Sequence, residues 1–173
     1  IHYLESISNS LDIALTEADL IQIKEELMQT GYVRRKYTKK KEKITSRPMH
    51  YISSDGYHMY VGKNNLQNEE LTFSFANGND WWFHAKGAPG SHVIVKTDGD
   101  ELPDRTFEEA GRLAAYYSKN RGSDKVEIDY VEKKHVKKPN GSKPGFVVYY
   151  TNYSLVIDSD ISNIKGLSGN KQS

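Results

Sequence analysis

Residues 80–93 form the segment with the highest density of side chains that could do chemistry. In a β-strand the side chains alternate between two faces, so His84 and Lys86 would point to the same side. The following proline–glycine turn would bring Ser91 and His92 back toward that side. A cation, two imidazoles, a hydroxyl and turn amides would then surround one small patch, and such a patch suits a phosphate group.

Other interpretations of this segment remain open. His84, His92 and Asp80 could bind a metal ion, although an eight-residue spacing of the histidines matches no familiar zinc or iron pattern. The two histidines could act as acid and base in phosphodiester cleavage, with Lys86 stabilising charge. A Ser91–His92 nucleophile pair is disfavoured, because neighbouring strand residues face opposite sides. The simplest interpretation is that these groups only hydrogen-bond a tight turn.

A second polar segment, residues 62–68, carries a lysine and four amide side chains directly after a predicted strand. Amide groups both donate and accept hydrogen bonds, so they match the base edges and sugar hydroxyls of RNA. The alternative is a polar loop in which asparagine stabilises turns. The candidate RNA contacts in this segment are Lys63, Asn64, Asn65, Gln67 and Asn68.

Residues 133–145 form a basic loop whose two prolines and two glycines restrict its backbone. A further basic tract, residues 34–47, holds eight basic residues and one glutamate and could lie near it. Aromatic residues interleave with these charges, and unpaired bases stack on exposed rings while lysines hold the phosphates. Most of the aromatic residues must build the core, which leaves about two or three for stacking. The candidate cations are Lys119, Lys137, Lys138 and Lys143.

Composition narrows the function classes. The 173 residues include 24 basic and 23 acidic side chains, yet residues 1–30 hold six acids and one lysine. Such separation of charge favours oriented binding of an anion. The absence of cysteine excludes disulfide scaffolds and thiolate zinc sites and fits a reducing compartment. No apolar run approaches the roughly 18 residues of a membrane span, and no signal peptide is visible in this segment.

The elements that must position these residues follow from the apolar periodicity. We predict a helical segment over residues 1–32, a basic linker over 33–48, a β domain over 49–158 and a flexible tail over 159–173. In the first segment, Thr16 and Asp19 predict the start of a second helix, and Gly31 predicts its end. We expect the first helix to continue from a segment upstream.

The β domain is predicted to be mostly antiparallel with one long helix, which gives an α+β fold. The Asp55-Gly56 dipeptide predicts a type I′ hairpin. Thr106 and Glu109 predict a capping box at the start of a helix that extends to Asn120. The predicted strands cover residues 49–54, 57–62, 71–76, 81–85, 92–96, 126–131, 146–150 and 153–157.

Four ordered blocks span about residues 46–157. The blocks are Tyr60-Val61-Gly62-Lys63-Asn64-Asn65-x-Gln67-Asn68, Trp82-Phe83-His84-x-Lys86-x-x-Pro89-Gly90-Ser91-His92-Val93, Ala114-Ala115-Tyr116-Tyr117-Ser118-Lys119, and Val136-Lys137-Lys138-Pro139-x-Gly141-x-Lys143-Pro144-Gly145 with Tyr150-Thr151-Asn152. Together they resemble the NFACT-R domain of bacterial RqcH-type proteins, a family once labelled fibronectin- or fibrinogen-binding proteins. Two departures stand out. Leu66 replaces an often basic residue, and Gly87-Ala88 replaces a bulkier, often acidic pair.

The resemblance implies an RNA-binding module within a cytoplasmic factor that binds large ribosomal subunits obstructed by peptidyl-tRNA. Such factors recruit alanyl-tRNA and direct template-free alanine tails. The helical flank would be the end of the family's coiled coil, so the NFACT-N domain and the rest of that coiled coil would be partners. This chain alone would not perform tailing.

We therefore predict an RNA-binding domain for tRNA or ribosomal RNA, with no catalytic residue, metal, cofactor or membrane contact. His84, Lys86, Ser91 and His92 would form its central patch. The amide segment would be one rim, and the lysines of the basic loop would be the other. The alternatives are a surface protein that binds fibronectin or fibrinogen, with an extracellular matrix protein as its partner, and a histidine-dependent phosphodiesterase or metal hydrolase.

Overall fold

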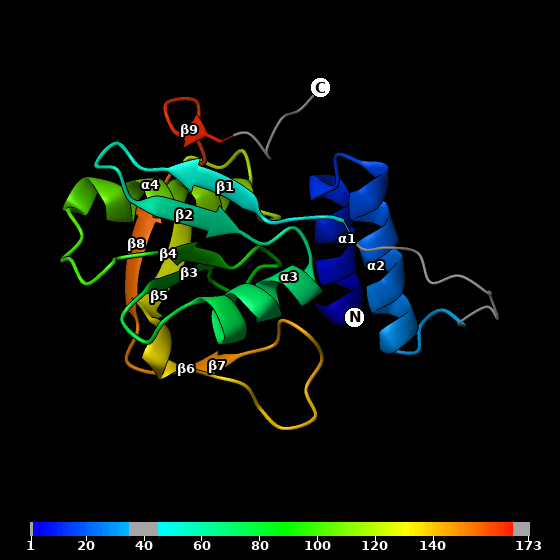
Figure 1. The fold of residues 1–173 in the computed structure, drawn as a ribbon. Helices are drawn as coiled ribbons and strands as arrows, with labels where there is room; N and C mark the ends of the chain where they lie inside the picture. Colours follow the sequence, from blue (N-terminus) through cyan, green and yellow to red (C-terminus); the bar gives the residue numbers. More distant parts are fainter. Residues whose placement is uncertain (1, 35–44, 168–173) are drawn as a thin grey trace.

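The computed structural model describes residues 2–34 and 45–167, and most of the predicted basic linker lies outside them. These residues form an antiparallel sheet of seven strands in the order β8-β5-β3-β4-β2-β1-β9, together with a two-stranded β6–β7 ribbon (Figure 1). The predicted α+β class, mostly antiparallel, is confirmed.

The helices and helical turns are α1 (His2–Ile13), α2 (Glu17–Gln29), α3 (Asn65–Glu70), the π-helix η1 (Leu71–Phe75), α4 (Asp104–Tyr116) and the 3-10 helix η2 (Lys133–His135). The strands are β1 (Met49–Ile52), β2 (His58–Val61), β3 (Trp81–Ala85), β4 (Val93–Val95), β5 (Val126–Glu132), β6 (Val136–Lys137), β7 (Val148–Tyr149), β8 (Tyr153–Ile157) and β9 (Lys165–Gly166). No helix among the described residues is long and apolar enough to cross a membrane.

The central strand β3 is buried on both of its faces. Phe83 and Ala85 pack on one side into the main core, which includes Leu113 and Ala114 of α4. Trp82 packs on the other side with the η1, β4, β5 and β6 residues Leu71, Ile94, Val131 and Val136. The alternation along β3 therefore sends His84 toward the same side as Trp82, away from α4.

The start and end predicted for α2 are confirmed. The hydroxyl of Thr16 accepts from the Asp19 amide at 3.2 Å, and the Asp19 carboxylate accepts from the Thr16 amide at 3.2 Å. Gly31 follows the helix with φ of +81°, a conformation that glycine adopts without steric cost. Reciprocal bonds of this kind satisfy two backbone donors that the helix itself leaves unpaired.

The α1–α2 hairpin lies against the sheet domain and next to α3 (Figure 1). Ile13 belongs to the main core, and the Asn9 side chain donates to the Tyr117 carbonyl at 3.2 Å. Lys63 forms a buried ion pair with Asp19 at 3.0 Å. Hydrophobic and polar contacts together therefore hold the hairpin on the domain.

The β1–β2 hairpin exists, but its predicted type I′ turn is wrong. Gly56 has φ of +91°, whereas Asp55 is not among the residues with positive φ. The connection is a longer loop, in which the Ser53 amide donates to the Tyr57 carbonyl at 2.8 Å. A five-residue loop needs only one left-handed residue, so Asp55 keeps an ordinary conformation.

The strand predicted over residues 71–76 is also wrong, because this segment is the π-helix η1. Asn64 caps α3 by accepting from the Gln67 amide at 2.9 Å, and the chain then stays helical through Phe75. The Ala76 amide bonds the Leu71 carbonyl at 2.9 Å. The alternation of apolar and hydroxyl residues that favoured a strand is here a helical surface that buries Leu71.

The predicted capping box of α4 is wrong as well. The helix starts at Asp104 after Pro103 and ends at Tyr116. Thr106 and Glu109 instead bind the β1–β2 loop: the Thr106 hydroxyl contacts Ser53 and Asp55, and the Glu109 carboxylate accepts from Ser54. These two residues therefore anchor a tertiary contact and leave the helix start uncapped by side chains.

The C-terminal segment differs from the predicted flexible tail. Residues 165–166 form β9, which pairs with β1, and Ile164 is buried in the main core. The part of the prediction on residues 168–173 lies outside the described residues. The strand predicted over 146–150 shortens to β7.

Replacing Gly62 with alanine should destabilise the fold. A Cβ atom there would lie 1.9 Å from Oδ1 of Asn68, whose side chain is buried and accepts from the His92 amide. We expect Gly62→Ala to lower the free energy of unfolding by about 1–3 kcal/mol or more, because a closely packed group must move. Urea unfolding followed by fluorescence measures this change.

Gly78→Ala is the matched control, because the nearest atom to its Cβ is Lys134 Cβ at 3.5 Å, an ordinary contact. Its stability should stay within about 0.5 kcal/mol of the wild type or rise slightly. Equal stability of the two variants would mean that the Gly62–Asn68 approach is not tight.

Candidate nucleic-acid interface

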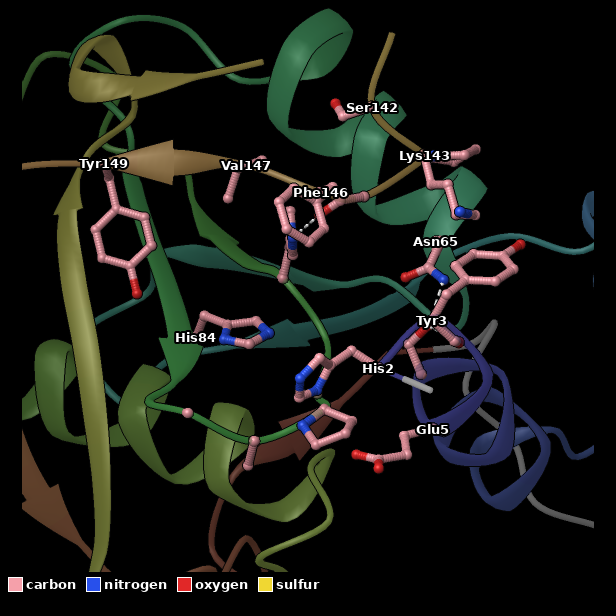
Figure 2. Close-up of a pocket in the computed structure, with 18 of the residues that line it drawn as sticks. His2, Tyr3, Glu5, Asn65, His84, Ser142, Lys143, Phe146, Val147 and Tyr149 are labelled. Atoms are coloured by element: carbon pink, nitrogen blue, oxygen red, sulfur yellow. Dashed lines mark hydrogen bonds between the residues drawn. The ribbon is translucent and has the colours of Figure 1, made fainter. Parts of the chain in front are cut away.

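An open groove of about 840 Å³ lies where the α1–α2 hairpin meets the sheet domain (Figure 2). Its walls are the turn over residues 87–90, the loop over residues 141–147 and the first turns of α1. Aromatic and imidazole rings line it further, namely Trp82, His84, His92, Tyr149, Phe146, Tyr3, Tyr32 and His2. A groove of this size and lining falls in the range of about 300–1,000 Å³ that is typical of ligand sites.

His84 and His92 come together in this groove as the sequence predicted. Their ring centroids lie 5.7 Å apart at an interplanar angle of 89°. His84 is half-buried and parallel to Trp82, with centroids 5.7 Å apart, whereas the Trp82 and His92 rings meet edge to face at 5.3 Å. Burial lowers the pKa of His84, so its imidazole is held neutral.

His92 is only 2% exposed, and both of its ring nitrogens are engaged. Nε2 lies 3.1 Å from the Gly145 carbonyl, which can only accept, so Nε2 donates. Nδ1 then accepts from the Thr72 hydroxyl at 2.7 Å. Burial and the neighbouring His84 lower the pKa of His92 well below 6.5. His92 therefore fastens the basic loop to η1 as a neutral ring.

The other two members of the predicted patch do not line the groove. Ser91 is 2% exposed, and its amide donates to the Tyr117 carbonyl at 3.1 Å. Lys86 is exposed next to the groove, and its ammonium forms an ion pair with Glu127 at 3.2 Å. The hydrogen bond to Glu127 raises the pKa of Lys86, which stays charged. The structure thus brings the two histidines together in the groove, but not Ser91 or Lys86.

The metal-site alternative has no geometric support. Asp80 is buried at the other end of β3, where it pairs with Lys96 at 2.7 Å and accepts from the Thr97 amide at 3.0 Å. Within residues 2–34 and 45–167, no group of three or more histidine or acidic side chains could hold a metal ion. The geometry does not support acid–base catalysis by His84 and His92 either, because both ring nitrogens of His92 are hydrogen-bonded inside the protein.

The amide segment turns inward and joins the domain to α2. The Asn64 and Gln67 side chains both donate to Gln22, at 2.9 and 2.7 Å. Asn65 donates to Glu26 through its side chain at 3.0 Å and its amide at 3.2 Å. Lys63 and Asn68 are buried as well. The expected exposed rim is not found here, and of this segment only Asn65 lines the groove.

A signal for this inward turn was present in the sequence. Asp19, Gln22 and Glu26 are spaced by three and four residues on α2, and all three are buried. A polar stripe at helical spacing that alternates with apolar residues indicates a face packed against polar partners. Asp19 bonds Lys63 and Ser46. The partners of Gln22 and Glu26 are the amide groups of residues 64–67.

The predicted lysines differ in whether their ammonium groups bond other groups of the protein. Lys119 bonds Ser8 and Asp12 of α1 at 2.8 and 2.6 Å. Lys138 pairs with Glu69 at 2.7 Å and also donates to carbonyls of its own loop. Lys137 is exposed.

Lys143 stands at the mouth of the groove. Its ammonium lies 5.4 Å from the ring centre of Tyr3 and 5.9 Å from that of Tyr32. Cation–π contacts of this kind hold a charge near a surface without neutralising it.

Phe146 and Tyr3 were not identified as site residues from the sequence. Phe146 is 58% exposed directly after the Pro144-Gly145 step, and Tyr3 projects from α1 into the same groove (Figure 2). An aromatic residue beside a proline–glycine break in a basic loop was the available signal for Phe146. Tyr3 carried none, because its helical spacing also fits a core position.

His92 should make stability depend on pH. A neutral buried histidine binds no proton in the folded state but binds one when unfolded, so stability falls as pH drops below the unfolded pKa. Between about pH 7.5 and about pH 5.5, the wild type should lose about 1 kcal/mol more of its unfolding free energy than His92→Asn, which keeps a polar side chain without a titrating ring. Urea unfolding at both pH values measures the difference. If the two proteins lose stability equally, the fold does not hold His92 neutral.

The comparisons with known proteins agree on one family. Residues 47–150 match the NFACT protein RNA binding domain. The protein called Rqc2 homolog RqcH of Streptococcus suis (strain 05ZYH33) is 44% identical over 166 residues, which cover 95% of this chain and 30% of that protein. The Rqc2 homolog RqcH of Bacillus subtilis (strain 168) is 40% identical over 167 residues, with 95% and 29% covered.

A solved structure is similar over nearly the same length. The C-terminal part of the fibronectin/fibrinogen-binding protein from Streptococcus suis superposes with a TM-score of 0.85 at 44% identity, covering 95% of this chain and 66% of that one. The chain spans about 30% of the length of the curated relatives it matches. With more than half of its residues matched and the fold shared, the chain belongs to the NFACT RNA-binding domain family.

Proposed function

We propose that this chain binds RNA through the groove and the basic loop beside it. One observation carries the proposal: an open groove lined by aromatic rings has Lys143 at its mouth, an exposed residue whose ammonium makes cation–π contacts with Tyr3 and Tyr32. RNA-binding proteins combine cations that hold phosphates with rings on which unpaired bases stack. The family match and the RqcH relatives support the same class of ligand.

The cations that would reach RNA are three of those predicted and two further lysines. Lys143 and Lys137 are exposed on the basic loop, and Lys86 is exposed beside the 87–90 turn. The nearby Lys133 and Lys134 of η2 extend this basic surface, with Lys134 pairing Glu132 at 3.5 Å. Lys119 and Lys138 contribute mainly through the internal contacts that position α1 and the loop.

The RNA in this proposal is tRNA or ribosomal RNA on an obstructed large ribosomal subunit in the cytoplasm. The chain would be the RNA-binding part of a longer RqcH-like factor that supports alanine tailing of stalled nascent chains, and its role would be binding without catalysis. The RqcH relatives and the chain's coverage of about 30% of their length support this larger context.

Binding to tRNA should weaken with salt, because each neutralised phosphate releases counterions. For wild-type protein, the logarithm of the association constant should fall linearly with the logarithm of salt concentration. Lys143→Gln should weaken binding several-fold and reduce that slope by about 0.7–0.9. Fluorescence anisotropy with labelled tRNA over a range of salt concentrations measures both quantities.

Lys165→Gln is the matched control, because Lys165 is exposed on β9 at the far edge of the sheet. Its affinity and slope should equal those of the wild type. A salt-independent affinity would contradict the proposal. So would binding to fibronectin that survives nuclease treatment in the absence of any RNA binding, which would favour the surface-protein alternative.

A further inference from the structure

We propose that the groove holds one unpaired nucleotide, with its base against the His84–Phe146 side and its phosphate at Lys143. The inference rests on the proposed RNA-binding function and specifies the part of the RNA that the groove takes. The site is formed by the three walls of the groove and the rings between them, which Figure 2 shows together.

The shape of the groove favours an unpaired nucleotide over a duplex. The 87–90 turn, the 141–147 loop and the start of α1 surround it on separate sides, and its volume is about 840 Å³. A rigid double helix could touch only its rim. A base that is splayed out of a loop or a strand end could enter and stack, which is how most sequence-reading RNA modules bind.

The rings in the groove are fixed before any ligand arrives. His84 lies parallel to Trp82, and Tyr149 packs on Trp82 with ring centroids 4.8 Å apart. The Tyr149 hydroxyl donates to Asp129 at 2.6 Å. These contacts already immobilise the rings. Stacking of a base here would therefore require little further ordering of the protein, and the entropic cost of binding would be small.

Of the two rings between which we place the base, His84 and Phe146, Phe146 is the exposed one. It is 58% exposed although it lies between residues that are half-buried, and it faces the groove from the 141–147 loop. Its backbone is constrained, since the Phe146 amide donates to the Lys143 carbonyl at 3.1 Å and its own carbonyl accepts from the Lys138 ammonium at 3.2 Å. An exposed aromatic side chain on a restrained loop is suited to stack on a base.

Charge gives the bound nucleotide a direction. Lys143 lies at one end of the α1 wall and Glu5 at the other, with Tyr3 and His2 between them (Figure 2). A phosphate is attracted to the lysine end and repelled from the carboxylate end. The carboxylate of Glu5 can accept hydrogen bonds, so it suits the sugar hydroxyls or an exocyclic amino group.

The test uses a short single-stranded RNA that carries 2-aminopurine, whose fluorescence is quenched by stacking, and a blunt RNA duplex as the second probe. Wild-type protein should quench the single strand. Phe146→Ala should lower affinity for the single strand at least about tenfold and remove the quenching, with duplex affinity unchanged. Phe146→Tyr should restore both.

Phe75→Ala is the matched control, since Phe75 is 40% exposed on η1 and does not line the groove. It should bind both probes like the wild type. If tRNA binds but Phe146→Ala leaves single-strand affinity and quenching unchanged, the inference is overturned while the proposed function stands. If neither single strand, duplex nor tRNA binds, the proposed function itself fails.

Discussion

The buried carboxylate of Glu26 is the interaction on which the groove depends. Glu26 is 0% exposed and accepts from the Tyr3 hydroxyl at 2.5 Å and from Asn65 at 3.0 and 3.2 Å. Burial raises its pKa, whereas the hydrogen bonds from Tyr3 and Asn65 oppose that shift. A buried carboxylate that loses its partners costs several kcal/mol, so this geometry is strongly specified. It fixes α1 to α3, and the first turn of α1 is one wall of the groove.

The polar contact between hairpin and domain explains where the charged and amide residues of this chain are used. Inside the interface, the Lys63 ammonium pairs with Asp19, and the Lys63 backbone amide donates to Gln67. The Ser46 hydroxyl bonds both Asp19 and Gln67, at 2.7 and 2.8 Å. Polar interfaces of this kind specify orientation more than they add stability. The orientation of the hairpin on the domain is therefore set together with the position of the groove.

Much of the fold follows from local pattern, and most of the site does not. The strands over 81–85, 126–132 and 153–157 and the cap at Thr16 lie where periodicity and cap chemistry place them. Elsewhere, contacts between residues distant in the sequence replaced the local structure that the pattern predicted. Thr106 and Glu109 bind the β1–β2 loop, and the amide side chains after Gly62 bond residues of α2. His84 and His92 were found because one turn joins their strands. Tyr3 reaches the same groove only through the docking of α1, which no local pattern encodes.

The central claim is that RNA meets this chain at the groove between the hairpin and the basic loop. Photo-crosslinking of a tRNA that carries 4-thiouridine, followed by peptide mass spectrometry, tests it most directly. The account predicts crosslinks concentrated in residues 141–147 and in the first turn of α1, which line the groove. Crosslinks concentrated on α4 or β9, which lie away from it, would contradict the account.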